Sequence, residues 1–173
     1  MQNFNYHSHT YRCGHADLDM KDEDYIKEYI KLGIKKMAFT DHSPLILDKR
    51  PNIRMDYSEK DEYLNSINKL KQKYNNKIEI ETGFEVEYLP GEEKNLLILK
   101  SETDKIILGQ HFIYDDDKNL KTFRNNNFSD SELIKYAQYI DKALELGILD
   151  IIAHPDLFLK NRKTFKGDSD FRV

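Results

Sequence analysis

The amino-acid sequence predicts a single α/β domain built around a parallel β-sheet. Its 173 residues are enough for one domain with a sizeable core. Short apolar runs alternate with longer amphipathic ones, and the later apolar runs are almost uninterrupted, as expected for strands covered on both faces. All six histidines lie at or just beyond the carboxyl end of an apolar run. In a closed or nearly closed parallel barrel these ends converge on one face, where α/β barrels build their active sites.

Five strands are expected, joined by helices through right-handed βα units. The strand-like runs cover residues 3–6, 36–40, 78–88, 105–111 and 148–155. Helices are expected from Asp22 to Gly33, after Ser58, over residues 92–100, and from Ser129 to Gly147. Asp22 is the expected N-cap of the first helix, while Ser58 with Asp61 and Ser129 with Glu132 predict capping boxes. In the third strand-like run, apolar residues alternate with glutamates, which places carboxylates on one side of the strand.

Composition and charge exclude several classes of protein. With 39% apolar and 34% charged residues, and no apolar run approaching the ~18 residues of a membrane span, the chain is expected to be globular. No export signal is visible, and the single cysteine, Cys13, cannot form an internal disulfide, so a cytoplasmic location is expected. Cys13 is expected to be a packing residue, and a role as a weak metal ligand is the alternative. The net charge of −4 is spread along the chain and predicts no surface for nucleic acid.

The histidines point to a metal centre. His7, His9 and His15 lie within nine residues, and side chains two apart in an extended strand share one side, so His7 and His9 can bind one ion. Core or surface histidines would scatter through helices and loops, whereas none lies inside an expected helix. Six imidazoles exceed the roughly four ligands of one zinc ion. With nearby carboxylates, they predict a cluster of two or three metals that can activate water and hold a phosphoryl group.

Six motifs occur in the order found in one known family. They are His7-Ser8-His9, Cys13-Gly14-His15-Ala16, Ala38-Phe39-Thr40-Asp41-His42-Ser43-Pro44, Gly83-Phe84-Glu85-Val86-Glu87-Tyr88, Gly109-Gln110-His111 and Ala153-His154-Pro155-Asp156-Leu157. With these motifs the sequence resembles the PHP (polymerase and histidinol phosphatase) superfamily, and within it the monofunctional histidinol-phosphatases. The resemblance implies a distorted, TIM-like (β/α)7 barrel with a trinuclear metal site. It assigns residues 1–157 to an incomplete PHP metal-dependent phosphatase domain and residues 158–173 to a polar tail.

The same resemblance implies a role for each site residue. The expected metal ligands are His7, His9 and Glu85 for a first ion, His15 and His42 for a second, and Glu85, His111 and His154 for a third. Glu85 would therefore bridge two ions. The expected catalytic residues are Glu85, Asp41 and His42. Arg54 and Arg162 are the candidates for binding the substrate phosphate, because a guanidinium can hold a phosphate through two parallel hydrogen bonds.

The sequence departs from the family pattern near its C-terminal end. Members of the family complete the site with an Asp-x-His motif on the last strand, which this sequence lacks, so two of the metals are each expected to lose one ligand. The last two βα units of the barrel are expected to be missing as well, which leaves the first five. Such a barrel would have an open edge that invites pairing with another chain, so homo-oligomers are expected.

The function expected from these observations is hydrolysis of L-histidinol phosphate, a small phosphorylated substrate, to L-histidinol and phosphate in histidine biosynthesis. Two or three divalent transition metals, zinc, manganese or iron, would be the cofactors, and the sequence does not choose among them. The alternatives are a PHP phosphoesterase with another substrate, a non-catalytic metal-binding remnant, and a nuclease-type PHP domain. The acidic net charge counts against the last of these. No nucleic-acid or membrane partner is expected.

Overall fold

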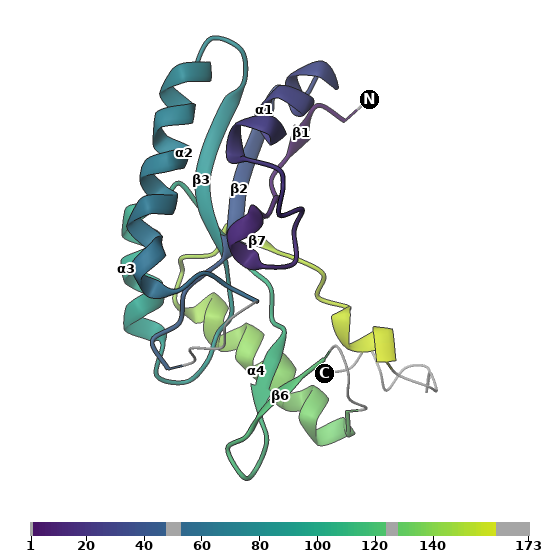
Figure 1. The fold of residues 1–173 in the computed structure, drawn as a ribbon. Helices are drawn as coiled ribbons and strands as arrows, with labels where there is room; N and C mark the ends of the chain where they lie inside the picture. The colour runs from purple at the N-terminus through teal and green to yellow at the C-terminus, as the bar shows by residue number, and fades with distance from the viewer. Residues whose placement is uncertain (1, 48–52, 124–127, 162–173) are drawn as a thin grey trace.

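A computed structural model describes residues 2–47, 53–123 and 128–161. Five strands form one curved sheet (Figure 1): β1 (Phe4–Asn5), β2 (Lys36–His42), β3 (Glu79–Val86), β4 (Lys105–Leu108) and β7 (Ile151–Ile152). The strand order is β1-β2-β3-β4-β7, and every neighbouring pair is parallel. The expected α/β class with a parallel sheet is therefore confirmed, and within the described chain β1 and β7 are its edge strands.

Four α-helices lie in the described ranges: α1 (Asp22–Lys31), α2 (Lys60–Tyr74), α3 (Glu93–Glu102) and α4 (Asp130–Glu145). The 3-10 helices found there are η1 (Tyr11–Cys13), η2 (Tyr57–Glu59) and η3 (Leu157–Asn161). Figure 1 shows α2 alongside β3, and α4 beside the hairpin of β5 (Phe112–Tyr114) and β6 (Leu120–Thr122). None of the helices in the part of the chain that is described is long and apolar enough to span a membrane.

The two faces of the sheet have different partners, because neighbouring side chains of a strand point in opposite directions. Met37 and Phe39 of β2 share one face with Phe84 of β3, and this face packs against apolar side chains of the helices in the main core. Each large apolar side chain that is fully buried there contributes roughly 1.5–3 kcal/mol to stability. On the opposite face, the last pair in the register joins His42 to Glu85. The core thus fixes the strands that carry these two polar residues.

The starts of α4 and α1 test two of the expected helix caps. The capping box of Ser129 with Glu132 is confirmed at the start of α4. The expectation that Asp22 caps α1 is wrong, because the N-cap is Lys21. Asp22 lies in the first turn, where its buried carboxylate accepts hydrogen bonds from the guanidinium of Arg12. A carboxylate held by a buried arginine is not available to cap the helix.

The start of α2 also differs from the expectation. The capping box is formed by Asp56 and Glu59, two residues before the expected pair of Ser58 and Asp61. Asp56 has an extended backbone, so its side chain can accept a hydrogen bond from the backbone N–H of Ser58. The 3-10 helix η2 follows at once and leads into α2.

Four of the five expected strands, β1, β3, β4 and β7, are shorter than predicted. β4 ends at Leu108 rather than at residue 111, and β7 is confined to Ile151–Ile152. The hairpin of β5 and β6 was not predicted, because its strands have only three residues each and carry no long alternating pattern.

The last described segment is packed against the domain. Leu157 and Phe158, in η3, contact an apolar cluster that contains Ile113 and Phe123. The expected polar tail of residues 158–173 thus begins inside a packed segment. Residues 162–173 lie outside the described part of the chain.

Candidate metal centre

The carboxylate of Glu85 is the centre of a histidine cluster at the carboxyl end of the sheet. Glu85 lies one residue before the end of β3, and its side chain is 1% exposed. Three imidazoles face its Oε2 atom: Nδ1 of His42 lies 3.1 Å away, Nε2 of His9 3.2 Å and Nε2 of His7 3.5 Å. His42 is the last residue of β2, while His7 and His9 follow β1. The parallel order of β1, β2 and β3 brings these side chains together.

The other oxygen of Glu85 faces two histidines from strands that come later in the chain. Nε2 of His154, after β7, lies 2.9 Å from Oε1, and Nε2 of His111, after β4, lies 3.6 Å from it. His154 and Glu85 are 69 residues apart in the sequence. Their contact therefore depends on the strand order, which places the ends of β3, β4 and β7 side by side.

The ligand atoms fall into small groups with the spacing of metal sites. In four groups the candidate atoms lie within 4.8 Å of one another: His7, His9 and Glu85; His9, His15 and His42; His42, Glu85 and His111; and His9, Cys13 and Asp41. The first group coincides with the expected first metal site. His154 lies beside Glu85, as expected, although it belongs to none of these groups. The structure thus brings all seven expected ligands into one cluster, and their division among ions stays a prediction.

Several of the imidazoles are oriented by a second contact on the ring nitrogen that points away from the cluster. Nδ1 of His111 donates to Oε1 of Glu87 over 2.9 Å, and Nδ1 of His15 donates to the backbone carbonyl of Cys13 over 2.9 Å. Nδ1 of His9 lies 3.2 Å from the sulfur of Cys13. Because an acceptor oxygen requires the proton on Nδ1, the Nε2 atoms of His111 and His15 keep their lone pairs. Such contacts are typical of histidines that bind metals.

Glu87 is in turn held by a buried arginine. Nη1 of Arg54 lies 2.8 Å from Oε2 of Glu87 and donates to the carbonyl oxygen of Ser43 over 2.9 Å. The Arg54 side chain is 3% exposed. These contacts connect Arg54 to His111 through Glu87. The sequence instead suggested that Arg54 binds the substrate phosphate. Arg162, the other arginine predicted to bind phosphate, lies outside the described residues.

Asp41 lies beside the cluster but does not face Glu85. Neighbouring side chains of a strand alternate, so His42 faces Glu85 and Asp41 points to the opposite face of β2. The Asp41 carboxylate accepts hydrogen bonds from the backbone N–H and the hydroxyl of Thr10. Burial raises the pKa of Asp41 in spite of these hydrogen bonds. Its described contacts position the chain next to His9, and its expected catalytic role stays a prediction.

The protonation states in the cluster suit a divalent metal. Burial acts to raise the pKa of Glu85, but hydrogen bonds from His154, His7 and His9 outweigh it and hold the pKa well below its usual range. Burial lowers the pKa of His42 to about 3, so this imidazole is neutral. The buried Nδ1 of His42 faces Oε2 of Glu85 but makes no hydrogen bond with any described residue, which fits a ligand atom. An anionic carboxylate among imidazoles is a donor set suited to zinc, manganese or iron.

Two backbone features leave room for this arrangement. A Cβ atom at Gly109 would lie 1.9 Å from Oε1 of Glu85, so only glycine permits the carboxylate its position. His154 has a φ of 32°, a left-handed conformation that is uncommon for a residue with a side chain. Strained residues of this kind cluster at functional sites. The two features place the carboxylate and the last histidine where they meet.

Two supporting residues were not predicted as part of the site. Glu87 lies two residues after Glu85, so the alternation of the strand indicated that both carboxylates share one side. Cys13 was expected to pack, with weak metal binding as the alternative, and it is fully buried. Its sulfur also accepts a hydrogen bond from the backbone N–H of His42 over 3.2 Å. The sequence carries no signal for this contact, because Cys13 lies in η1 and His42 in β2, 29 residues apart.

The fold and the cluster together define a class of protein. A curved parallel sheet with a buried carboxylate and five imidazoles at the carboxyl ends of its strands is typical of an α/β-barrel protein with a metal site. The family model of the PHP domain matches residues 5–171. This match covers most of the chain, and the chain belongs to the PHP domain family.

Curated relatives share part of the sequence. A protein described as a histidinol-phosphatase from Deinococcus radiodurans is 25% identical over 157 residues, which are 87% of this chain and 59% of that protein. The histidinol-phosphatase of Bacillus subtilis is 30% identical over 125 residues, or 67% of this chain and 46% of the relative. One described in the same way from Schizosaccharomyces pombe is 36% identical over 104 residues, or 53% of this chain and 32% of the relative. The chain thus spans less than two thirds of these proteins.

Solved structures share the fold. A crystal structure from Listeria monocytogenes, described as a histidinol phosphatase, superposes with a TM-score of 0.75 at 21% identity, over 90% of this chain and 67% of the other. The histidinol phosphate phosphatase of Lactococcus lactis, solved in complex with zinc, L-histidinol and phosphate, gives a TM-score of 0.72 at 18% identity. That match covers 99% of this chain and 66% of the other. At these identities the likeness shows the fold.

Proposed function

We propose that the protein is a metal-dependent phosphomonoesterase that hydrolyses L-histidinol phosphate to L-histidinol and phosphate in histidine biosynthesis. The observation that carries this proposal is the convergence of five histidines on the buried carboxylate of Glu85. The histidinol-phosphatases among the curated relatives support the substrate class. The zinc, L-histidinol and phosphate in the Lactococcus lactis structure support both the cofactor and the substrate.

Two or three divalent metals, zinc, manganese or iron, are the proposed cofactors. The residues proposed to hold them are His7, His9 and Glu85 for one ion, His15 and His42 for a second, and Glu85, His111 and His154 for a third. When bound, such metals supply an activated water and positive charge for the phosphoryl oxygens. The short distances between the ligand atoms support more than one ion around the single carboxylate of Glu85.

The protein's own residues would fix charge and geometry around the substrate. Glu85 stays anionic because its pKa is lowered, and His42 stays neutral because burial lowers its pKa. Glu87 keeps the proton of His111 on Nδ1, which leaves Nε2 directed at Glu85. Arg54 is proposed to serve the site through its ion pair with Glu87, more than as a direct phosphate ligand.

Metal binding without phosphatase activity is the second candidate. It is favoured by the coverage of the relatives, because the chain spans 59%, 46% and 32% of the three curated proteins. If catalysis needs ligands from the part of the relatives that is not matched, this chain alone would bind metal and turn over substrate slowly. A PHP phosphoesterase with another substrate is a variant of the first proposal.

Phosphate release from L-histidinol phosphate tests these candidates. The chain, its Glu85→Gln variant, and a fusion to the unmatched part of the Bacillus subtilis relative are assayed with excess Mn²⁺ or Zn²⁺. We expect the fusion to exceed the chain on the order of 10²-fold, since a displacement of ~1 Å in an active site can cost that much. Glu85→Gln should abolish both rates. No release by any of the three would favour metal binding alone, and release from p-nitrophenyl phosphate only would indicate another substrate.

A further inference from the structure

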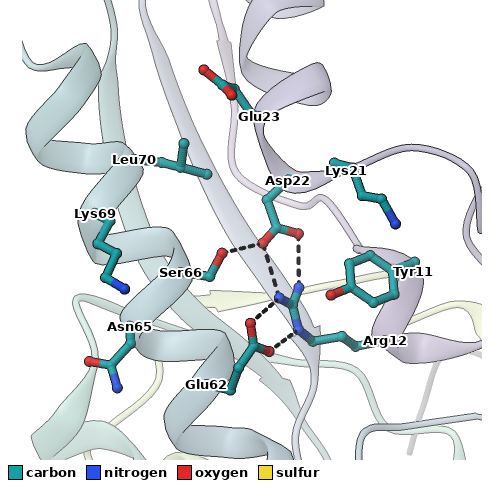
Figure 2. Close-up of a pocket in the computed structure, with 10 residues that line it drawn as sticks. All are labelled: Tyr11, Arg12, Lys21, Asp22, Glu23, Glu62, Asn65, Ser66, Lys69 and Leu70. Atoms are coloured by element: carbon teal, nitrogen blue, oxygen red, sulfur yellow. Dashed lines mark hydrogen bonds and ion pairs between the residues drawn. The ribbon is translucent and has the colours of Figure 1, made fainter.

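Arg12 lies in the short segment that separates His9 from His15, and its side chain is almost completely buried. It belongs to η1, and 3% of the side chain is exposed. Figure 2 shows its guanidinium between two carboxylates that come from different helices. Asp22 of α1 accepts from Nη1 over 2.8 Å and from Nη2 over 3.1 Å. Glu62 of α2 accepts from Nε over 3.0 Å and from Nη2 over 3.1 Å.

The same segment contacts the candidate metal centre on its other side. Nη1 of Arg12 also donates to the hydroxyl of Thr10 over 3.2 Å, and Thr10 donates both its N–H and its hydroxyl to Asp41. Cys13 accepts from the backbone N–H of His42, and its sulfur lies 3.2 Å from Nδ1 of His9. Thr10 and Cys13, on either side of Arg12, thus contact Asp41, the backbone of His42 and the side chain of His9.

The ion pairs of Arg12 are better explained by their effect on the position of its segment than by a gain in the stability of the fold. A buried arginine paired with a buried carboxylate gains little net stability over apolar residues of the same size, because the guanidinium of Arg12 and the carboxylate of Asp22 both lose water. A guanidinium with two bidentate partners, however, fixes the orientation of the groups that it joins. Asp22 is also held by Ser66 of α2, whose hydroxyl donates over 2.6 Å. The segment is therefore anchored to two helices at once.

We propose that Arg12 is a positioning residue for the metal centre. Its ion pairs with Asp22 and Glu62 fix the 10–13 segment on α1 and α2, and this holds the imidazoles of His9 and His15 toward His42. The inference rests on the proposed metal-dependent function. It assigns to Arg12 a role in the affinity of His9, His15 and His42 for a metal ion. It assigns to Arg12 no role in the contact between His154 and Glu85.

The surroundings of Arg12 allow the role to be tested by chemical rescue. A pocket of about 700 Å³ between α1 and α2 is lined by Arg12 and its two carboxylate partners (Figure 2). In an Arg12→Ala variant, a small planar cation such as methylguanidinium can enter this pocket and bind both carboxylates. Methylammonium carries the same charge but lacks the planar fork of donors, so it serves as the control.

Co²⁺ titration, followed by absorption spectroscopy, is the main experiment. We expect Arg12→Ala to weaken Co²⁺ binding at the His9, His15 and His42 group about 10–100-fold, the usual effect of removing a residue that orients metal ligands. Methylguanidinium should restore much of the affinity and the absorption bands, while methylammonium should not. Lys60→Ala is the matched control, because Lys60 is a buried cation of α2 that pairs with Glu102 of α3. Unchanged binding by Arg12→Ala, or equal rescue by both cations, would overturn the proposal.

Two further measurements distinguish a failure of the role proposed for Arg12 from a failure of the variant to fold and from a failure of the proposed function. If Arg12→Ala does not fold, Glu62→Gln removes one of the two partners at a side chain that is 63% exposed, and a several-fold loss of Co²⁺ affinity is expected. If the wild-type chain binds no Co²⁺, the proposed function fails. Hydrogen exchange of the metal-free protein then tests the role of Arg12. The amides of residues 10–15 should exchange faster in Arg12→Ala, or in Glu62→Gln if Arg12→Ala does not fold, than in wild type and Lys60→Ala. Equal protection would overturn the role of Arg12.

Discussion

At the scale of single residues, Glu87 offers a direct test of how the imidazoles are oriented. Its carboxylate joins Nδ1 of His111 to the guanidinium of Arg54. Burial acts to raise the pKa of Glu87, but the charge of Arg54 and the hydrogen bond from His111 lower it to about 2. We expect Glu87→Gln to weaken Zn²⁺ binding about 10–100-fold in isothermal titration calorimetry. Glu79→Gln, at the start of β3 and 61% exposed, is the control and should bind zinc like wild type. Equal affinities in both variants would contradict this role.

The close approach of Gly109 to Glu85 leads to a second prediction for a single residue. A methyl group at this position would meet Oε1 of Glu85 at 1.9 Å, so the carboxylate must move in a Gly109→Ala variant. We expect a loss of stability of about 1–3 kcal/mol, as for other overpacked sites, together with a loss of bound metal. Gly83→Ala is the comparison, because its methyl group would lie 2.4 Å from the backbone oxygen of Lys105 and not against Glu85. It should destabilise the fold without displacing the Glu85 carboxylate directly. Retention of full metal content by Gly109→Ala, measured by elemental analysis, would argue against Glu85 as a ligand.

The residues of the cluster were predicted more completely than their supports. His7, His9, His42 and Glu85 lie at strand ends within recognisable motifs, so sequence alone indicated them. The contacts of Cys13 and Glu87 join segments that are far apart in the sequence, and no spacing in the sequence reports this. Arg54 shows the same limit, because the sequence gives its charge and not the carboxylate that it meets.

At the scale of elements, the start of α4 allows a test by pH. Glu132 completes the capping box with Ser129 and pairs with Lys121 of β6. Burial acts to raise the pKa of Glu132, but the hydrogen bonds from Lys121 and Ser129 outweigh it, and the net pKa is lowered. A lowered pKa means that the ion pair stabilises the fold above the ordinary glutamate pKa, about 4.3, and that this contribution is lost as the pH falls through the lowered value.

The prediction is that Glu132→Gln is less stable than wild type near pH 7, by up to about 1 kcal/mol, and equally stable near pH 2. Glutamine can still complete the capping box, so the change isolates the charge. Urea unfolding at both pH values measures the difference. Lys142→Gln, whose pairing with Glu145 is exposed, is the control and should show little effect at either pH. A difference that persists undiminished at pH 2 would show that packing, not charge, explains the variant.

Elements with long patterns were predicted well, and short ones were not. The helix of residues 130–145 has both a capping box and an apolar stripe, so its position followed from the sequence. The hairpin of β5 and β6 has three residues in each strand and is held by the apolar cluster around Ile113 and Phe123. Packing between distant segments decides such an element, and local patterns do not report it.

At the scale of the whole molecule, the described sheet has open edges at β1 and β7. Unpaired backbone groups at the edge of a sheet are a template for another chain. We therefore expect the purified protein to self-associate, with dimers that increase with concentration in analytical ultracentrifugation. A lysine at Asn5, on the edge strand β1, should weaken this association. A single monomeric species at every concentration, for wild type and variant alike, would show that these edges are covered in another way.

The histidine cluster around Glu85 is proposed to bind more than one metal ion. Anomalous diffraction at the zinc edge, from crystals of protein grown with Zn²⁺, tests it most directly. We expect at least two anomalous peaks in the cluster, at about 2.0–2.2 Å from imidazole nitrogens and from the Glu85 carboxylate. Crystals of Glu85→Gln should show weaker peaks. A cluster without any anomalous peak at saturating zinc, with its imidazoles placed as described here, would contradict the account.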